Sequence, residues 1–324
     1  MTYDKIHFKS ESVFLVTGGA GFIGSNLCEV LLDKGYKVRC LDNLSSGKQE
    51  NVDLFIDNPN YTFIKGDIRN FETCLKASEG VDFILHQAAW GSVPRSIEMP
   101  ILYEDINIKG TLNMMEAARQ NKVKKFVYAS SSSVYGDDPK LPKQEGKEGN
   151  LLSPYAITKK VNEEYGKIYK TLYNLDTIGL RYFNVFGKRQ NPNGPYAAVI
   201  PKFIELIKNN KEIIIHGDGS QSRDFTYIDN VILANLLSCK SDFIKDLFFM
   251  NIACEAQTSV NELVDLLFNI MNKKTSIKHN EPRLGDVKHS NASILVARTK
   301  INYKPIVNIE EGLRKTVDWY TESK

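Results

Sequence analysis

The stretch Val13-Phe-Leu-Val-Thr-Gly-Gly-Ala-Gly-Phe-Ile-Gly24 decides the fold of this chain. A short apolar run leads into glycines spaced three residues apart, and an amphipathic helical pattern follows at once. The first glycine permits a tight turn, the second lets a pyrophosphate approach the backbone, and the third lets the helix pack closely on the strand. The start of the helix then faces the phosphates of a bound dinucleotide. We assign to that contact Gly18, Gly21, Phe22, Ile23 and Gly24.

Apolar runs of strand length alternate with helical patterns, for example at residues 22–34 and 111–120. This alternation is typical of repeated βαβ units, which build a parallel sheet covered by helices on both faces. The sequence therefore predicts an α/β fold with a doubly wound parallel sheet, the Rossmann architecture. The buried strands are expected at residues 13–17, 37–41, 61–65, 81–86, 125–130 and 177–182.

The regular alternation ends near Tyr182. Beyond it come turn-rich segments, notably Gln190-Asn-Pro-Asn-Gly-Pro195 and Gly217-Asp-Gly-Ser220, and then shorter helical and strand patterns. We expect residues 1–182 to form a dinucleotide-binding Rossmann domain. Residues 183–324 should form mainly a smaller α/β substrate lobe, with some segments returning to the first domain. No internal repeat or flexible linker separates the two parts, so they should pack closely.

The composition excludes several classes of partner. With 42% hydrophobic residues, 25% charged residues and a net charge of only +3, the 324-residue chain is an ordinary globular protein rather than a basic nucleic-acid binder. Its five cysteines form no Cys-x-x-Cys pair and no His, Asp or Glu cluster has metal-ligand spacing, so neither disulfides nor a metal site are expected. No apolar run approaches the ~20 residues of a membrane helix, and the N-terminus lacks the apolar core of a signal peptide. We expect a cytoplasmic protein without membrane or nucleic-acid partners.

Asp42 discriminates between the two common dinucleotides. It closes the second expected strand, 18 residues after Gly24, where a carboxylate can accept hydrogen bonds from the adenosine ribose hydroxyls. It would repel the 2′-phosphate of NADP, and no Arg follows it directly. A turn-forming acid before Asn43 is the alternative interpretation. The strand, turn and helix around Asp42 favour NAD as the cofactor, with Asp42 and Asn43 beside its ribose.

A second motif, Tyr155-Ala-Ile-Thr-Lys159, lies downstream of the glycine turn. In a helix a spacing of four places both side chains on one face, where the ammonium can favour the Tyr155 phenolate. A phenol with a lowered pKa is a usable general base near neutral pH. Most isolated Tyr-x-x-x-Lys pairs are solvated helix faces. The preceding dinucleotide site makes redox chemistry on a sugar alcohol the favoured interpretation.

Several segments in order resemble the extended short-chain dehydrogenase/reductase family nearly end to end. They are the glycine turn, Asp42, Gly66-Asp-Ile68, Ser130-Ser-Ser-Ser-Val-Tyr-Gly136 and the Tyr155/Lys159 pair. More closely, the chain is similar to the bacterial UDP-N-acetylglucosamine 4-epimerases. The segments that support this closer resemblance are Gly91-Ser-Val-Pro-Arg-Ser96, Leu152-Ser-Pro-Tyr-Ala156, Arg181-Tyr-Phe-Asn-Val-Phe-Gly187, Tyr196-Ala-Ala-Val-Ile-Pro201, Ser222-Arg-Asp-Phe225 and Gly285-Asp-Val-Lys-His-Ser290.

The resemblance implies three catalytic residues. Tyr155 would be the base on the sugar 4-hydroxyl, and Lys159 would hold the nicotinamide ribose and lower the Tyr155 pKa. Ser131 would hydrogen-bond the reacting oxygen, and Ser132 and Ser133 are neighbouring candidates for that role.

The resemblance also implies binding residues for both ligands. Beyond the residues named above, the cofactor would contact Asp67, Ile68, Gln87, Ala88 and Ala89. The arginines assigned to the uridine diphosphate are suited to it because a planar guanidinium matches phosphate oxygens. The residues implied for the UDP-sugar are Asn184, Val199, Arg223 and Arg283, with Ser290 beside the sugar.

The implied reaction follows from these groups. Tyr155 would remove the hydroxyl proton while hydride passes from sugar C4 to tightly held NAD, giving a 4-keto sugar whose C4 is planar. Rotation of the sugar while the UDP stays anchored would return hydride to the other face, which regenerates NAD. The serine run excludes related chemistry, because sugar 4,6-dehydratases carry Asp-Glu at positions 132 and 133 and UDP-xylose synthases carry Glu at 133.

Substrate choice is expected to depend on Ser290. In the resembling epimerases this position borders the C2 substituent of the sugar, and enzymes restricted to UDP-glucose and UDP-galactose carry Tyr there. A serine leaves room for an N-acetyl group. We therefore favour interconversion of UDP-N-acetylglucosamine and UDP-N-acetylgalactosamine. A UDP-uronate or UDP-glucose 4-epimerase is the alternative within the fold, and a non-catalytic dinucleotide-sensing module is the alternative of another class.

Two features remain outside these motifs. The family usually dimerises through helices that correspond to about residues 96–120 and 154–173, which implies a homodimer. Trp90 follows Ala89 in the expected cofactor region, where a single aromatic is more often packing than recognition. The sequence leaves the role of Trp90 open.

Overall fold

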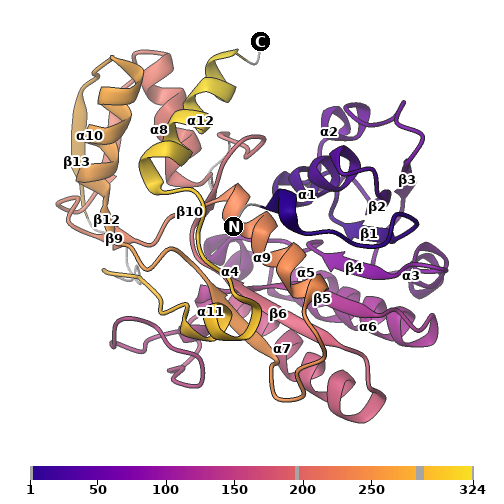
Figure 1. Ribbon diagram of the computed structural model, residues 1–324. Coiled ribbons are helices and arrows are strands. Elements are labelled where there is room, and N and C mark those ends of the chain that lie inside the picture. Colours follow the sequence, from indigo (N-terminus) through magenta and orange to yellow (C-terminus); the bar gives the residue numbers. More distant parts are fainter. Residues whose placement is uncertain (1–2, 194–196, 282–287, 323–324) are drawn as a thin grey trace.

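A computed structural model describes residues 3–193, 197–281 and 288–322 of the chain (Figure 1). Its centre is a seven-stranded sheet in the order β11-β6-β5-β4-β1-β2-β3, and every neighbouring pair of strands is parallel. The predicted doubly wound parallel sheet is confirmed. Its strands are β1 (Val13–Thr17), β2 (Lys37–Asp42), β3 (Tyr61–Lys65), β4 (Phe83–His86), β5 (Lys125–Ser131), β6 (Thr177–Tyr182) and β11 (Phe249–Ile252).

Helices cover both faces of this sheet (Figure 1). Successive side chains of a strand point to opposite faces, and β1 shows the result. Phe14 and Val16 belong to one apolar cluster, Leu15 belongs to another, and all three are fully buried. Continuous apolar strands are expected where helices cover both faces. Helices α1 (Phe22–Asp33) and α9 (Ile228–Lys240) cover one face, and α3 (Phe71–Ala77), α6 (Gly110–Gln120) and α7 (Pro154–Tyr173) cover the other.

The order of the strands reverses between β1 and β4. The chain passes from β1 outward through β2 to β3 and then returns to place β4 on the other side of β1. Ligands of doubly wound sheets bind at the carboxyl ends of the strands at such a point, because the two connections leave in opposite directions. Thr17 at the end of β1 pairs with His86 at the end of β4. The glycine turn and the segment after His86 therefore line this crevice from its two sides.

Short helical segments fill the connections between the strands. Residues 93–120 are almost continuously helical, and a π-helical turn, η2, interrupts them. Such turns are frequent at functional sites, and η2 carries the fully buried Asn107. These segments are α4 (Val93–Glu98), α5 (Pro100–Glu104) and η2 (Asp105–Lys109), and elsewhere η1 (Tyr3–Lys5), α2 (Gln49–Asp53) and η3 (Ser132–Tyr135).

Helix α7 carries both Tyr155 and Lys159, so the helix expected from their spacing is confirmed. Its start follows from the local sequence. The Ser153 side chain accepts a hydrogen bond from the Ala156 backbone N–H and acts as the N-cap. Pro154 occupies the first helical position, where its missing N–H leaves no bond unmade.

A buried ion-pair network holds α7 against the sheet. Arg181 on β6 is fully buried, and its Nε and Nη2 donate to the two oxygens of Glu163 on α7 at 2.7 Å and 2.8 Å. Glu163 also accepts a hydrogen bond from the Ser130 hydroxyl on β5 at 2.7 Å. The Arg181 guanidinium additionally donates to Glu148 at 2.5 Å and lies over the Phe249 ring of β11 at 3.9 Å. One arginine thus joins β5, β6, β11, α7 and the loop before α7.

Most of the chain after β6 forms a smaller lobe, at the upper left of Figure 1. Three later segments, α9, β11 and α11 (Leu295–Ile301), lie on or beside the large sheet instead, and β11 pairs with β6 (Figure 1). The division near residue 182 stays a prediction, because one apolar cluster includes residues from both parts. The elements of the lobe are β7 (Val185–Phe186), α8 (Val199–Lys208), β8 (Ile213–His216), β9 (Ser222–Arg223), β10 (Thr226–Tyr227), β12 (Thr258–Ser259), α10 (Val260–Met271), β13 (Ile277–Asn280) and α12 (Ile309–Glu322).

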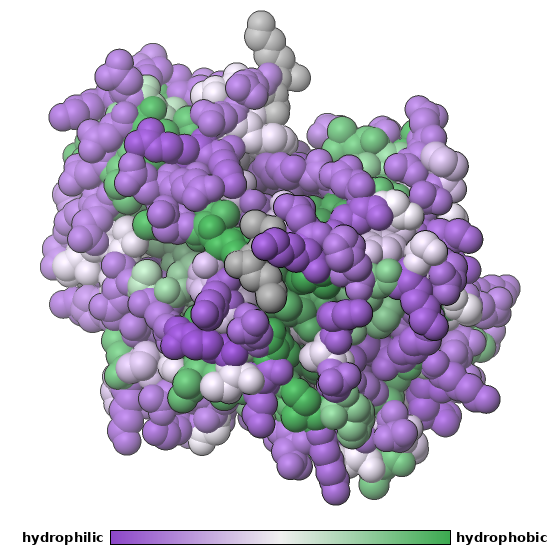
Figure 2. Space-filling model, viewed as in Figure 1, coloured by the Kyte–Doolittle hydropathy of each residue, from purple (hydrophilic) through white to green (hydrophobic). Residues whose placement is uncertain are grey.

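The surface is mostly hydrophilic. Figure 2 shows hydrophobic residues gathered along the middle of one face, between more hydrophilic parts to the left and right. Among the residues that the structure describes, no helix is long and apolar enough to cross a membrane. Within the same residues, no group of three or more His, Cys, Asp or Glu side chains is arranged to hold a metal ion.

Candidate active site

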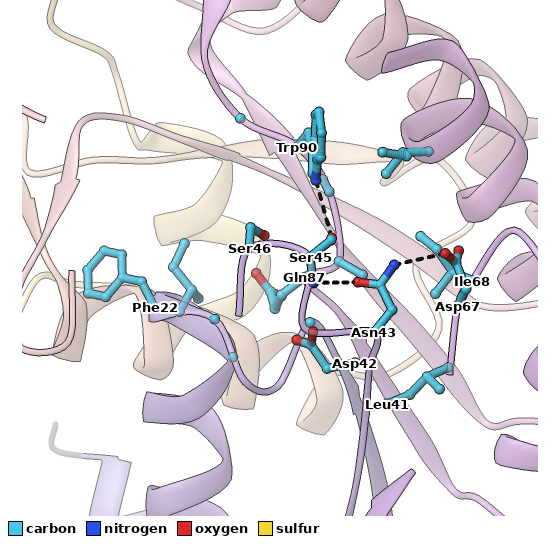
Figure 3. A pocket seen from close by; sticks show the side chains of 18 of the residues that line it. Phe22, Leu41, Asp42, Asn43, Ser45, Ser46, Asp67, Ile68, Gln87 and Trp90 are labelled. Carbon is cyan, nitrogen blue, oxygen red and sulfur yellow. Dashed lines mark hydrogen bonds between the residues drawn. The ribbon is translucent and has the colours of Figure 1, made fainter. Parts of the chain in front are cut away.

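A cavity of about 350 Å³ opens at the crevice between β1 and β4 (Figure 3). It is lined by the glycine turn, by the ends of β2 and β3, and by the segment after β4. Every residue assigned to the cofactor from the sequence lines this cavity, apart from Tyr155 and Lys159. They are Gly18, Gly21, Phe22, Ile23, Gly24, Asp42, Asn43, Asp67, Ile68, Gln87, Ala88 and Ala89.

The glycine turn fits a dinucleotide pyrophosphate. Gly18 has a φ of +66°, and a Cβ on it would lie 2.7 Å from the backbone N of Ala88. A Cβ on Gly24 would lie 2.1 Å from the carbonyl oxygen of Gly18, so any side chain there would push α1 away from the turn. No side chain caps the start of α1, which leaves the backbone N–H groups of its first turn available to phosphate oxygens.

Asp42 fits the ribose of NAD. Its carboxylate lines the cavity and accepts hydrogen bonds from the backbone N–H groups of Ala20 at 3.0 Å and Leu44 at 2.8 Å. Burial raises the pKa of Asp42, and these two bonds oppose the rise. A carboxylate has about four acceptor positions, so two remain for ribose hydroxyls. An anion held at this position disfavours a 2′-phosphate, which agrees with the expected choice of NAD.

The far wall of the cavity is a polar chain of fixed side chains (Figure 3). The Asn43 amide donates to Asp67 at 2.8 Å. Arg69 donates to both oxygens of Asp67, at 3.0 Å and 2.7 Å. The bonds from Arg69 are the main reason why the pKa of Asp67 is lowered to about 2. Asp67 is therefore a permanent acceptor beside the expected adenine position.

The structure brings the three predicted catalytic residues together at the end of β5. The Lys159 ammonium donates to the carbonyl oxygen of Ala129 at 2.8 Å and lies 5.8 Å from the centroid of the Tyr155 ring. The Ser131 side chain lies close enough to the Tyr155 phenol to lower its pKa, against the effect of burial. The Tyr155 backbone N–H donates to the Ser96 hydroxyl at 3.1 Å, which ties the start of α7 to α4.

Burial dominates the electrostatics of this group. It lowers the pKa of Lys159 from 10.5 to about 8. Burial also raises the pKa of Tyr155, and Ser131 offsets only part of the rise. We expected Lys159 to lower the Tyr155 pKa, and this expectation is wrong when only residues of the chain surround Tyr155. The phenolate loses more stabilisation from hydration than the ammonium returns.

The serine run offers hydroxyl groups beside Tyr155. Ser131 ends β5 and accepts a hydrogen bond from the backbone N–H of Ser133, whereas Ser132 begins η3. The Ser133 hydroxyl oxygen is buried, and no group in the described ranges of the chain hydrogen-bonds it. An unpaired buried hydroxyl is costly, so this oxygen marks a place for a polar group of a ligand.

A second cavity of about 180 Å³ lies in the smaller lobe, against α8, β8 and β9. It brings together Asn184, Val199 and Arg223, three of the residues predicted to bind the uridine diphosphate. Arg283 lies outside the described residues. The sequence analysis assigned no role to several other polar and aromatic residues that line this cavity. These residues include Lys202, Phe203, His216 and Gln221.

Ser290 lies next to the strand that carries Arg223. Its backbone N–H donates to the carbonyl oxygen of Ser222 at 3.0 Å, and the Ser222 hydroxyl is 2.9 Å from Nδ1 of His289. Ser290 therefore directly follows His289, whose ring is held against the Ser222 hydroxyl. Neither Ser290 nor the catalytic residues are among the residues that line the two cavities.

Comparisons with known proteins agree with this geometry. Residues 14–250 match the NAD dependent epimerase/dehydratase family. In sequence the chain is 37% identical to the UDP-glucose 4-epimerase of Mycolicibacterium smegmatis over 308 residues, which cover 94% of this chain and 97% of that protein.

Solved structures are equally similar. The UDP-N-acetylglucosamine 4-epimerase from Methanobrevibacter ruminantium M1, in complex with UDP-N-acetylmuramic acid, has a TM-score of 0.92 and 41% identity over 97% of this chain and 99% of that chain. The UDP-glucuronic acid 4-epimerase from Bacillus cereus, in complex with UDP-glucuronic acid and NAD, has a TM-score of 0.88 and 31% identity, covering 96% and 100%.

The chain therefore belongs to the NAD-dependent epimerase/dehydratase family. The predicted family relationship and the predicted cofactor, NAD, are confirmed. The relatives are UDP-sugar 4-epimerases whose names give different sugars. The narrower resemblance to UDP-N-acetylglucosamine 4-epimerases rests on one of these structures and stays a prediction.

The burial of Lys159 has a consequence for stability. Lys159→Met should make the cofactor-free protein more stable at pH 7 by about 2 kcal/mol, because an apolar side chain of similar length replaces a buried ammonium. The pKa of Lys159 is about 8 in the folded chain against 10.5 in the unfolded chain, so the folded state binds fewer protons between these pH values. The stability of the parent therefore rises with pH across this window, and the advantage of the variant should shrink there.

Chemical denaturation of parent and variant at pH 7 and above pH 8 measures this difference. Lys167→Met, on the exposed part of the same helix, is the matched control and should show no such pH dependence. A Lys159→Met protein less stable than the parent at pH 7 would contradict the buried-charge argument.

Proposed function

We propose that the chain catalyses the reversible C4 epimerisation of UDP-N-acetylglucosamine to UDP-N-acetylgalactosamine. The observation that carries the proposal is the assembly of Tyr155, Lys159 and Ser131 at one strand end, with serine instead of an acid at positions 132 and 133. A proton-transfer group without a nearby carboxylate favours epimerisation over elimination. It also argues against a module that only senses the dinucleotide, since such a module needs no proton-transfer group.

Bound NAD supplies the acceptor and donor of hydride in this chemistry. The residues of the chain supply the proton chemistry. Tyr155 takes the proton of the 4-hydroxyl and later returns it, and Ser131 hydrogen-bonds the same oxygen. Because burial raises the Tyr155 pKa, the phenolate needs positive charge close by when the site is loaded, and Lys159 is the cation on its helix face. Lys159 is buried and Tyr155 is only partly exposed, so little water reaches this pair.

The smaller lobe is proposed to anchor the nucleotide. Asn184, Val199 and Arg223 border a cavity whose size suits part of a nucleotide, and the unpaired Ser133 hydroxyl suits a sugar oxygen. Arg283 is assigned the same role as Arg223 on the resemblance alone. Anchoring through the UDP leaves the sugar ring able to turn over, which epimerisation at C4 requires.

The choice of sugar rests on Ser290. Serine has a small side chain. Ser290 directly follows His289, whose ring contacts Ser222, and its own backbone N–H bonds Ser222, so Ser290 lies beside Arg223. The relative at 41% identity is named a UDP-N-acetylglucosamine 4-epimerase, which supports an N-acetylhexosamine. A UDP-uronate is the second candidate, since the relative at 31% identity is named for UDP-glucuronic acid.

We also propose that the protein is a homodimer. Helix α7 exposes apolar side chains on one face, with Ile157, Ile168 and Leu172 exposed by 47%, 46% and 69%. Helix α5 packs beside α7 and exposes 82% of Ile101. Apolar residues concentrated on neighbouring helices are typical of an interface between copies. The resemblance implies the same two helical segments.

The activity can be tested without added cofactor. The purified protein, incubated with UDP-N-acetylglucosamine, UDP-glucose and UDP-glucuronic acid in turn, should yield the C4 epimer of the first sugar fastest, as followed by NMR. Tyr155→Phe keeps the ring and removes the ionisable oxygen, so turnover should fall by roughly 10²- to 10⁴-fold. A folded Tyr155→Phe protein with near-parent turnover would exclude Tyr155 as the base.

Ser290→Tyr should abolish epimerisation of UDP-N-acetylglucosamine and spare that of UDP-glucose. A Tyr ring fills the space that the N-acetyl group would occupy, and overlap in a packed site costs about 1–3 kcal/mol or more. Ser290→Ala, which adds no volume, is the control and should keep the parent preference. If the Tyr variant converts UDP-N-acetylglucosamine at the parent rate, Ser290 does not set the choice of sugar.

Light scattering of the purified protein tests the assembly. A homodimer should have twice the 36.7 kDa of one chain. Leu172→Glu, which places a charge on the exposed apolar face of α7, should shift the mass toward the monomer, whereas Lys167→Glu on the same helix should not. A parent protein that stays monomeric at micromolar concentration would exclude the dimer.

A further inference from the structure

Trp90 lines the cofactor cavity and contacts another residue that lines it. The indole Nε1, on the segment after β4, donates to the Ser45 hydroxyl, on the segment after β2, at 3.4 Å (Figure 3). Both residues line the cavity, although they come from segments that follow different strands. A dinucleotide in this cavity would therefore lie beside the Trp90–Ser45 contact.

The Trp90 backbone is held rigidly. The side-chain oxygen of Asn107 accepts from the Trp90 backbone N–H at 2.9 Å, and the Asn107 amide donates to the Trp90 carbonyl oxygen at 3.0 Å. Asn107 is fully buried, and its amide also donates to the Thr158 hydroxyl on α7. A surface loop residue that only fills space does not need a buried side chain bonded to both of its backbone groups.

The Trp90 ring is held as well. The Arg95 guanidinium lies 4.1 Å from the centroid of the indole, within the range of a cation–π contact. Tyr103 packs edge-on against the same ring at 6.0 Å, and its hydroxyl accepts a hydrogen bond from Arg95 Nε at 3.2 Å. Tyr103 also packs edge-on against Tyr155 at 6.3 Å. The indole therefore belongs to a packed group that continues to the proposed catalytic base.

The segment that carries Ser45 is held by hydrogen bonds as well. Together with the contacts of Trp90 they form a closed ring of contacts, called the circuit below. The Ser45 backbone N–H donates to Asn43 at 2.9 Å, and Asn43 donates to Asp67 at 2.8 Å. Arg69 then links Asp67 at 2.7 Å to Asp105 at 3.1 Å. Asp105 belongs to η2, the same turn that carries Asn107 and so holds Trp90. Among these hydrogen bonds the 3.4 Å contact between Trp90 and Ser45 is the longest and therefore the weakest.

We infer that Trp90 is a cofactor-retaining residue, whose indole, stacked on Arg95 and bonded to Ser45, slows the release of the dinucleotide between turnovers. The inference rests on the proposed assignment of this cavity to NAD. It gives Trp90 a role in binding rather than in proton transfer. Its effect should therefore be visible in cofactor exchange in the absence of any sugar.

Exchange of isotope-labelled NAD tests the inference. The protein is loaded with labelled NAD and diluted into excess unlabelled NAD, and the label retained over time is measured by mass spectrometry. Trp90→Ala should raise the dissociation rate about 10-fold or more, because it removes both the stacked cover and the hydrogen bond. Trp90→Phe and Ser45→Ala each remove the hydrogen bond and should raise it by about threefold. Trp319→Phe, which alters the other of the two tryptophans far along the chain, is the matched control and should leave it unchanged.

Fluorescence supplies a second readout. In the Trp319→Phe protein Trp90 is the sole tryptophan, so reduced dinucleotide bound in this cavity should quench its emission by energy transfer. A parent protein that holds NAD while Trp90→Ala releases it at the parent rate would overturn the inference and leave the proposed function intact. If the parent protein does not retain NAD and the Trp319→Phe protein does not show this quenching, both the inference and the assignment of the cavity are overturned.

Discussion

The buried ion pair between Arg181 and Glu163 is the constraint on which the proposed active site depends. Glu163 follows Lys159 by one helical turn, and Ser130, which donates to the same carboxylate, directly precedes Ser131. The pair therefore fixes both the register of α7 and the end of β5 beside the residues that would react. Buried pairs contribute little net stability, but removing one partner costs about 3–5 kcal/mol because a charge is left unpaired. Its value here is positional: any slip of α7 along the sheet would break it.

The site places a buried lysine ammonium near a buried histidine that stays uncharged. Burial lowers the pKa of Lys159 to about 8, so the ammonium is present at neutral pH at a cost to folding. His86 is also fully buried, and burial lowers its pKa to about 3, so its ring is uncharged between the hydroxyls of Thr17 and Thr111. A protonated His86 would repel Lys159. The end of β4 thus meets its hydrogen-bonding needs with two threonines, and the positive charge stays on α7.

The sequence predicted the parts of the structure that local pattern determines. The first six strands of the sheet, the glycine turn, Asp42 and the helix at Tyr155 follow from spacing within single segments. The sequence analysis did not identify Glu163, Asn107 or Arg69. Each of them acts through a partner that only folding brings close, and no motif surrounds it. The direction of the Tyr155 pKa was wrong for the same reason. Spacing from Lys159 is local information, whereas the burial that dominates the pKa is set by the whole fold.

The two proposed ligand sites, the dinucleotide cavity and the cavity of the smaller lobe, differ in how many strands are paired around them. This difference suits an epimerase. The dinucleotide cavity lies at the edge of a seven-stranded sheet and is surrounded by a circuit of hydrogen bonds. The cavity of the smaller lobe lies against β8 and β9, and each of these strands belongs to a two-stranded pair. A reaction that returns its cofactor unchanged gains nothing from cofactor exchange, yet its nucleotide sugar must enter and leave in every cycle. A two-stranded pair has fewer ladder hydrogen bonds to break than a seven-stranded sheet, so opening for the sugar costs less at the proposed nucleotide-sugar site, while the sheet edge keeps the dinucleotide in place.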